Sequence, residues 1–199
     1  MNIRVSRLRA LLAVVLLSFG LASCGINTIP TLQEAAKAKW AEVQNQYQRR
    51  SDLIPSLVET VKGYAKQEKD VLTGVIEARA KATQVHVDAA DLTDPDKIKQ
   101  FQEAQGQLSG ALGRLLAVSE NYPDLKSNQN FLALQSQLEG TENRIGVARR
   151  DYIGAVRDYN LTLQTFPSML WAMTVFRSKK PMASFTAAEG AQTPPTVKF

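Results

Sequence analysis

Cysteine and histidine are nearly absent from this 199-residue chain, which has one of each, Cys24 and His86. A single cysteine can form neither an intramolecular disulfide nor a cysteine-based metal cluster. No second histidine or cysteine and no carboxylate cluster accompanies His86 at ligand spacing, so we expect a solvated loop histidine, no metal and no cofactor. A GxSxG nucleophile motif and a glycine-rich phosphate loop are also missing, and we therefore expect no enzyme activity.

A basic stripe interleaved with aromatic residues, the usual mark of a nucleic-acid-binding protein, is missing as well. The formal charge is +5, with 24 Lys and Arg against 19 Asp and Glu. Removal of Arg4, Arg7 and Arg9 at the N-terminus would leave 21 basic residues against the same 19 acidic ones. Charges of both signs are interspersed along the rest of the chain, so we exclude nucleic acid as the main partner.

The N-terminal residues have the outline of a secretory signal peptide. The three arginines are followed by an uncharged apolar run from Ala10 to about Ala22. This run is shorter than the roughly 20 residues that a transmembrane helix needs. The sequence therefore predicts that residues 1–23 are a cleaved leader; an uncleaved signal anchor is the alternative.

The apolar run ends in Leu21-Ala22-Ser23-Cys24, which resembles the lipobox of bacterial lipoproteins. The resemblance implies cleavage between Ser23 and Cys24, a lipid on Cys24, and a short lipid-anchored linker over residues 24–30. Gly25, rather than an aspartate, follows the cysteine and favours the outer membrane over the inner membrane. We expect a protein of the cell envelope on the periplasmic side, held to the membrane through the lipid on Cys24.

Apolar residues recur at steps of three and four through most of the remaining chain, which predicts amphipathic helices. The first helix is predicted over about 31–85, with a kink around Ser51 to Pro55; a restart with Asp52 as N-cap is the alternative. Its expected apolar seam is Leu32, Ala36, Trp40, Val43, Tyr47, Ile54, Leu57, Val61, Tyr64, Leu72 and Ile76.

Three further helices are predicted after the first. Asp94 and Pro95 are a favourable N-cap and first helical residue, and they start a helix over about 95–120. Its expected seam is Ile98, Phe101, Gln105, Leu108, Leu112, Leu115 and Ser119. A long helix over about 126–166 follows, and residues 168–176 form a short fourth helix that caps the bundle or, alternatively, contacts a membrane or partner.

These lengths predict an all-α fold, an elongated antiparallel bundle of three long helices plus a short fourth, over residues 31–177. Residues 178–199 are rich in Ala, Pro, Thr and Gly, and we expect them to form a poorly ordered tail.

Several long motifs resemble those of LemA family proteins. They are NQYQRRSDLIPSLV at 45–58, YPDLK at 122–126 and LEGTENRI at 138–145, together with Tyr159-Asn160 and Phe166-Pro167. The resemblance implies an all-α bundle of long antiparallel helices, attached to a membrane at its N-terminus, with no established biochemical activity. Many family members begin with an uncleaved membrane helix, whereas this chain has a lipobox in that place.

Four charged residues lie near the predicted seams: Arg50 and Asp52 on the first helix, and Glu142 and Arg149 on the third. One interpretation is a pair of carboxylates for acid–base chemistry, or an arginine site for an anion. The other is a polar layer that pairs between helices and sets their register. We favour the polar layer, since buried polar groups in bundles commonly have that role.

Together these features predict a non-enzymatic envelope lipoprotein that acts as a scaffold or interaction module. Its expected partners are the membrane, through the lipid on Cys24, and an unidentified envelope protein. A small-ligand or lipid-binding helical module, with a groove beside Met169 to Phe176, is the alternative from another class.

Overall fold

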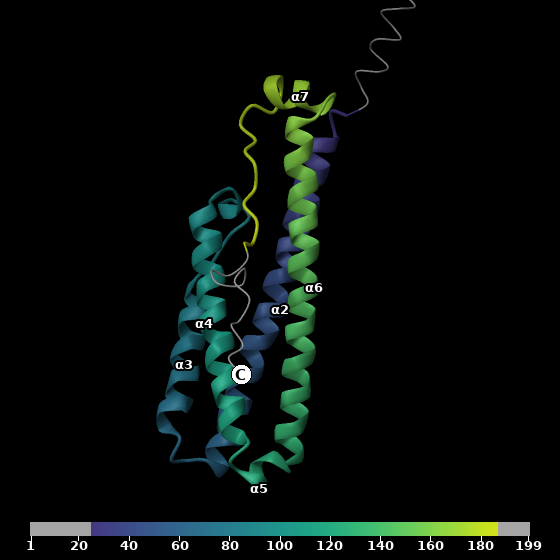
Figure 1. Cartoon of the computed structure of the whole chain (residues 1–199). Helices are drawn as coiled ribbons and strands as arrows, with labels where there is room; N and C mark the ends of the chain where they lie inside the picture. Colours follow the sequence, from purple (N-terminus) through teal and green to yellow (C-terminus); the bar gives the residue numbers. More distant parts are fainter. Residues whose placement is uncertain (1–24, 187–199) are drawn as a thin grey trace, which may run out of the picture.

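The computed structural model of the chain describes residues 25–186, and within that range it contains helices and no strand (Figure 1). The helices are α2 (Thr28–Tyr64), α3 (Lys69–Gln84), α4 (Pro95–Ser119), α5 (Pro123–Lys126), α6 (Gln129–Gln164) and α7 (Ser168–Thr174), with a 3₁₀ turn η1 at Asp91–Thr93. The predicted all-α fold is confirmed.

Two helix pairs lie side by side in an elongated bundle (Figure 1). The long helices α2 and α6 pack along each other, and α3 packs along α4. The 37 residues of α2 extend roughly 55 Å at 1.5 Å per residue. The short helix α7 lies across one end of the α2–α6 pair, where the described chain begins, and α5 lies at the opposite end.

The single helix predicted over 31–85 is two helices, because the chain turns back at residues 65–68. Ala65 leaves the helical conformation, with φ −127° and ψ 54°. Distant residues hold the turn: the Tyr122 hydroxyl donates to Glu68 Oε1 at 2.7 Å, and Asn128 Nδ2 donates to the Tyr64 hydroxyl at 2.9 Å. Since these partners come from the α4–α6 connection, no local feature of the sequence marked this turn.

Pro55 neither ends nor restarts α2, which is one helix from Thr28 to Tyr64. The alternative of a restart at Asp52 is therefore wrong. The start of α4 was predicted correctly: Asp94 Oδ1 accepts from the backbone N–H of Asp96 at 3.0 Å and of Lys97 at 3.3 Å. Every member of the seam predicted for α4 is buried.

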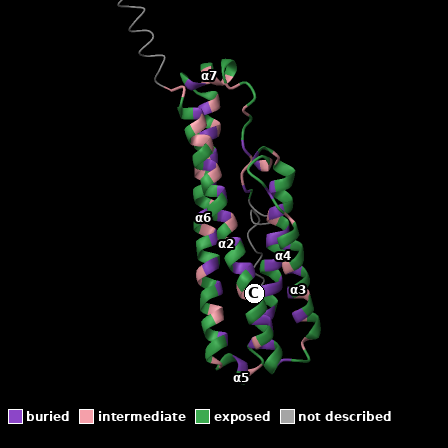
Figure 2. Cartoon of the chain, turned by 180° about the vertical axis from the view of Figure 1, so that it is seen from behind, coloured by how far each residue is buried: buried purple, intermediate pink, exposed green. Residues whose placement is uncertain are grey.

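The buried apolar side chains form two clusters along the bundle, and Figure 2 colours the buried residues purple along the helices. The first lies toward α7 and includes Trp40, Tyr47, Phe101, Tyr152 and Phe185. The second lies toward α5 and includes Ile54, Leu57, Leu108, Phe131 and Leu138. In the first cluster the Trp40 ring centroid lies 5.2 Å from that of Phe101 and 5.1 Å from that of Tyr152, so aromatic contacts add to its apolar burial.

The start of the predicted disordered tail is ordered, which corrects the expectation for residues 178–186. Met182 and Phe185 are buried in the first cluster. Asn160 Nδ2 donates to the Met182 carbonyl at 2.9 Å, and Asn160 Oδ1 accepts from the Met182 N–H at 2.8 Å. Small and polar residues dominate the composition of this segment, although two of its apolar side chains enter the core. Its backbone also pairs with the side chain of Asn160, which the composition of the tail does not indicate. Residues 187–199 lie outside the described part of the chain.

The short fourth helix exists as α7, and part of it packs on the bundle. Trp171, Ala172 and Phe176 are partly buried against the first cluster. No helix within residues 25–186 is both long and apolar enough to cross a bilayer. The predicted leader, the cleavage site between Ser23 and Cys24, and the lipidation site at Cys24 lie outside the described residues.

Candidate functional site

A layer of polar side chains separates the two apolar clusters at the middle of the bundle. On α2, Arg50 and Ser51 lie between Tyr47 of the first cluster and Ile54 of the second. Gln105 on α4 and Thr141 on α6 hold the corresponding positions on their helices. All four are buried, although each is polar. The core of this bundle is therefore interrupted at one level by hydrogen-bonding groups.

Arg50 is the centre of this layer, with 1% of its surface exposed. Its Nη1 donates to Ser109 Oγ at 2.7 Å and to Glu142 Oε1 at 2.8 Å. Its Nη2 donates to the side-chain oxygen and, at 3.2 Å, to the backbone oxygen of Gln105. One planar guanidinium thus connects α2 with both α4 and α6, a fork geometry that lysine cannot reproduce.

Gln105 completes the layer on the side of α3. Its Oε1 accepts from Arg50, and its Nε2 donates to the Ala82 carbonyl at 3.2 Å. The amide group is therefore used at both ends, and it joins α4 to α2 and α3. The polar layer therefore joins α2, α3, α4 and α6 at one level of the bundle.

Tyr47 borders the layer, with its ring 5.0 Å from the Arg50 guanidinium. Burial raises the pKa of the Tyr47 hydroxyl above its usual value, and the positive charges of Arg149 and Arg50 oppose that rise. Tyr47 is consequently a neutral hydrogen-bonding group at physiological pH and not a phenolate base.

The structure brings two of the four candidate charged residues together. Arg50 and Glu142 form an ion pair, in which the Glu142 side chain is 43% exposed. Asp52 is exposed on α2 and accepts from Gln48 on the same helix at 2.7 Å. Arg149 lies over the Phe185 ring, 4.4 Å from its centroid, and so covers the docked tail. The layer contains Gln105 and Ser109 in place of Asp52 and Arg149.

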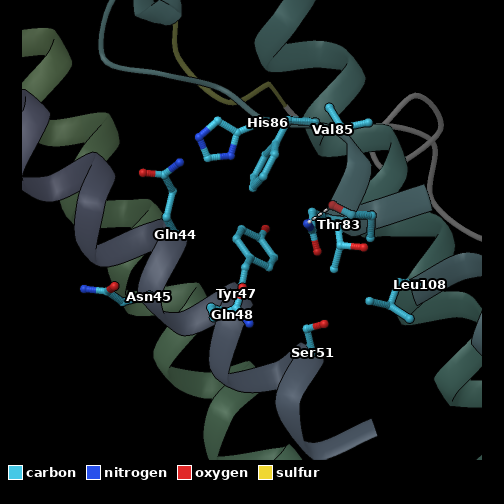
Figure 3. A pocket seen from close by; sticks show the side chains of 12 residues that line it. Gln44, Asn45, Tyr47, Gln48, Ser51, Thr83, Val85, His86 and Leu108 are labelled. Atoms are coloured by element: carbon cyan, nitrogen blue, oxygen red, sulfur yellow. Dashed lines mark hydrogen bonds between the residues drawn. The ribbon is translucent and has the colours of Figure 1, made fainter. Parts of the chain in front are cut away.

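A cavity of about 310 Å³ opens beside the layer, between α2, α3 and α4 (Figure 3). It is lined by Gln44, Asn45, Tyr47, Gln48 and Ser51 of α2, Ala82 and Thr83 of α3, Val85 and His86 of the following loop, and Phe101, Gln105 and Leu108 of α4. Ser51 is buried, and within the described residues its hydroxyl has no hydrogen-bond partner. This volume is at the lower end of the range for small-molecule sites.

The cavity lining has few ionisable side chains. Within the described part of the chain, no carboxylate, lysine or arginine lines it. His86 lies at its edge, where its exposed ring contacts Asp88 with Nε2 to Oδ1 at 2.9 Å. Between residues 25 and 186, no group of three His, Cys, Asp or Glu is placed to hold a metal ion. The lining suits a small uncharged molecule with one hydrogen-bonding group directed at Ser51.

A sequence model of the LemA family matches residues 39–199. The chain belongs to the LemA family. The match includes Arg50, Gln105 and Glu142, and it starts after the predicted leader and Cys24.

Similar proteins include magnetosome proteins. MamQ 1 and MamQ 2 of Paramagnetospirillum magneticum are each 27% identical to this chain over 157 residues, which is 71% of this chain and 58% of theirs. Protein LemA of Metamycoplasma hominis is 25% identical over 124 residues, 62% of this chain and 52% of that protein. The chain therefore spans a little over half the length of these relatives.

Proposed function

We propose that this LemA family protein is a lipoprotein of the cell envelope whose helical bundle acts as a non-enzymatic interaction module. The observation that carries the proposal is the Leu21-Ala22-Ser23-Cys24 quartet at the end of an apolar run, four residues before α2 begins at Thr28. A lipid on Cys24 would hold the bundle directly at a membrane surface, on the periplasmic side. Gly25 favours the outer membrane.

The polar layer supports a structural and not a catalytic role for the buried charge. Arg50 makes four hydrogen bonds inside the bundle, and its charged partner Glu142 is one of these contacts, so the guanidinium is already occupied by groups of the chain itself.

The outer face of α6 supports interaction with another protein. Leu132, Val147 and Leu161 are each about half exposed. They are separated by 15 and 14 residues, close to four helical turns, so they lie on the same side of α6 at intervals of roughly 21 Å. These side chains are separate apolar contact points that a partner protein lying along α6 would meet.

The lipid anchor is tested by the intact mass of the protein purified from bacterial membranes. We expect a chain that starts at Cys24 and carries additional acyl mass, and a Cys24→Ser variant that retains its leader. A Ser18→Ala variant, changed in the leader but outside the quartet, should be processed normally. An unmodified full-length mass from the unaltered protein would instead establish the uncleaved signal anchor.

The interaction module is tested by photo-crosslinking in living cells. A crosslinking amino acid in place of Val147 should give one dominant adduct with an envelope protein, whereas the same group in place of Lys99, exposed on α4, should not. Equal adduct patterns at the two positions would contradict a specific contact on α6. Turnover of a substrate by the purified protein, lost in a folded Glu142→Gln variant, would contradict the non-enzymatic role.

A second candidate function is the binding of a small molecule in the cavity beside Ser51. The unpaired, buried hydroxyl of Ser51 favours it, since such groups usually find a partner. Native mass spectrometry of protein isolated without denaturation should show a retained small molecule that a Thr83→Phe variant, blocked at the cavity mouth, has lost. Thr73→Phe, on the same helix but outside the cavity, is the matched control. Absence of any retained mass in the unaltered protein would reject this candidate.

A further inference from the structure

Four large apolar side chains are exposed at the α7 end of the bundle. Phe166, Leu170, Met173 and Val175 have exposed fractions of 77%, 51%, 62% and 58%. We call these four residues the α7 face. Leu170 and Met173 are spaced by three residues within α7, so they lie on one side of that helix. Grouped exposure of this kind on a folded domain usually marks an interaction surface.

The α7 face has a fixed orientation, because the other side of the same segment packs on the bundle. Trp171, Ala172 and Phe176 contact the first apolar cluster, and Ser168 is buried. The Arg177 Nε donates to the Met173 carbonyl at 2.7 Å and so gives this carbonyl, near the C-terminal end of α7, a hydrogen-bond donor. The exposed apolar side chains therefore belong to a docked element that presents them outward.

The described chain begins next to this face. A β-carbon built on Gly25 would lie 3.6 Å from Ser168 Oγ and 3.9 Å from Pro167 Cγ. Cys24 is bonded to Gly25, and a residue adds at most about 3.6 Å of reach. A lipid on Cys24, as proposed above, would therefore bring the membrane surface to the α7 face and not to the α5 end.

The charged residues closest to the α7 face in the sequence are basic. No aspartate or glutamate occurs in residues 25–33 or 159–186, whereas Arg177, Lys179 and Lys180 follow α7 directly. The opposite end of the bundle, in contrast, has Glu120 and Asp124 beside Lys126. Basic side chains next to exposed apolar ones are the combination that binds an anionic lipid surface.

We propose that the α7 face enters the headgroup region of a bilayer containing anionic lipids, as a second membrane contact encoded by the protein itself. Interfacial elements of this type bury their apolar side chains about 5–10 Å into the boundary between headgroups and acyl chains. Arg177 and Lys180, which are exposed, lie where phosphate groups would be. The contact orients the bundle with its long axis away from the membrane and its α5 end roughly 50 Å out.

The test uses the full-length protein, purified from membranes and reconstituted in vesicles of phosphatidylethanolamine and phosphatidylglycerol. A solvent-sensitive fluorescent amino acid replaces Met173 in one sample and Ser127, at the α5 end, in the other. We expect blue-shifted emission at position 173 that lipids with brominated acyl chains quench by at least twofold. Emission at position 127 should resemble that of the probe in water and should not be quenched by these lipids.

Two results would overturn the proposal. One is water-like emission at position 173 that soluble iodide quenches equally with and without vesicles. The other is blue-shifted emission that brominated lipids fail to quench, because the occupant would then be protein, either another part of this chain or a second copy. Circular dichroism of both labelled proteins confirms that the helices remain.

The contribution of the basic residues to the α7 contact is tested with two matched sets of variants. Combining Arg177→Gln, Lys179→Gln and Lys180→Gln should reduce the quenching at position 173 in phosphatidylglycerol vesicles to the level in phosphatidylcholine vesicles. Combining Lys62→Gln, Lys66→Gln and Lys126→Gln removes the same charge near the α5 end and should leave the quenching unchanged. Equal loss in both sets would contradict a local contact at the α7 face.

The inference rests on the proposed lipid anchor, because the anchor determines which end of the bundle faces the membrane. The experiments nevertheless distinguish a failure of the anchor from a failure of the α7 contact. A protein with lipid on Cys24 and a solvated probe at position 173 retains the anchor and rejects the α7 contact. A protein without lipid whose probe is quenched by brominated acyl chains retains the α7 contact and rejects the lipoprotein.

Discussion

The Nε of Arg79 on α3 donates to the carbonyl oxygen of Ser51 on α2 at a distance of 3.0 Å. In an uninterrupted helix this carbonyl would accept from the backbone N–H four residues later, but that residue is Pro55, which has none. Ser51 is 4% exposed, so water has little access to replace the missing donor. Arg79 supplies it from the neighbouring helix, which is a physical reason why α2 continues through Pro55.

The first prediction concerns this replacement donor. An Arg79→Ala variant should lose about 1–2 kcal/mol of unfolding free energy in urea, because a buried carbonyl is left without a partner. In a Pro55→Ala background the new backbone N–H reaches Ser51, so the same Arg79→Ala change should cost much less. The double-mutant cycle measures this difference. Strictly additive costs would show that Arg79 stabilises the bundle in some other way.

The second prediction concerns the polar layer around Arg50. Arg50→Ala should lower the unfolding free energy by about 2–4 kcal/mol, since it opens a cavity and leaves the buried side chain of Gln105 without a donor. Arg50→Lys should cost about 1–2 kcal/mol, because an ammonium group cannot reach acceptors on two helices at once.

Glu142→Gln separates the ion pair from the rest of this layer. The Glu142 side chain is half exposed, and its loss should therefore cost less than about 1 kcal/mol. Arg49→Ala, at the neighbouring exposed position, should stay within about 0.5 kcal/mol of the unaltered protein. If Glu142→Gln were as costly as Arg50→Ala, the ion pair and not the buried amide would be the main contribution.

The third prediction concerns the docked tail. Phe185 is buried, with its ring centroid 5.8 Å from that of Trp40 and 5.6 Å from that of Tyr152. Phe185→Ala should cost about 3–4 kcal/mol in urea unfolding and speed amide hydrogen exchange over residues 181–186. Thr186→Ala, the next residue and exposed, should do neither. Faster exchange without a loss of stability would mean that the tail covers the core without contributing to it.

The sequence was sufficient to predict where a helix begins and which side of it is buried wherever capping residues and apolar periodicity agreed. The α4 seam was predicted residue by residue, and Asp94 with Pro95 marked the start of that helix, because capping and helical spacing are encoded within a few residues. Gln105 was placed correctly in that seam, but its hydrogen-bonding role was not predicted. Arg50 and Glu142 were selected because they are charged residues near the predicted seams.

The misses have a common physical cause, since each depends on partners far away in the sequence. The turn at residues 65–68 has no proline or capping box of its own and is held by Tyr122 and Asn128. The extension of the seam to Tyr64 and Ile76 failed with it, because both side chains are exposed once the chain reverses. The prediction of a disordered tail used only the composition of that segment. The residues that bind it, Asn160 and the aromatic cluster, lie more than twenty residues earlier in the sequence.

The last prediction concerns alkaline pH. Burial raises the pKa of the Tyr152 hydroxyl, which is fully buried and donates to the Ala183 carbonyl at 2.8 Å. The folded protein therefore holds this proton more tightly than the unfolded chain, whose tyrosines titrate near pH 10. The stabilisation is fully present below pH 10 and decreases as pH rises above it, by up to about 1.4 kcal/mol per pH unit.

A Tyr152→Phe variant should consequently be less stable than the unaltered protein at pH 7, by about 1 kcal/mol, because the Ala183 carbonyl loses its donor. Between pH 10 and 12 its unfolding free energy should fall less steeply, so that the two curves converge. Urea unfolding at a series of pH values measures both effects. Tyr159→Phe should act in the same direction, since burial also raises the pKa of Tyr159. Parallel curves for Tyr152→Phe and the unaltered protein above pH 10 would show that this hydroxyl does not titrate with unfolding.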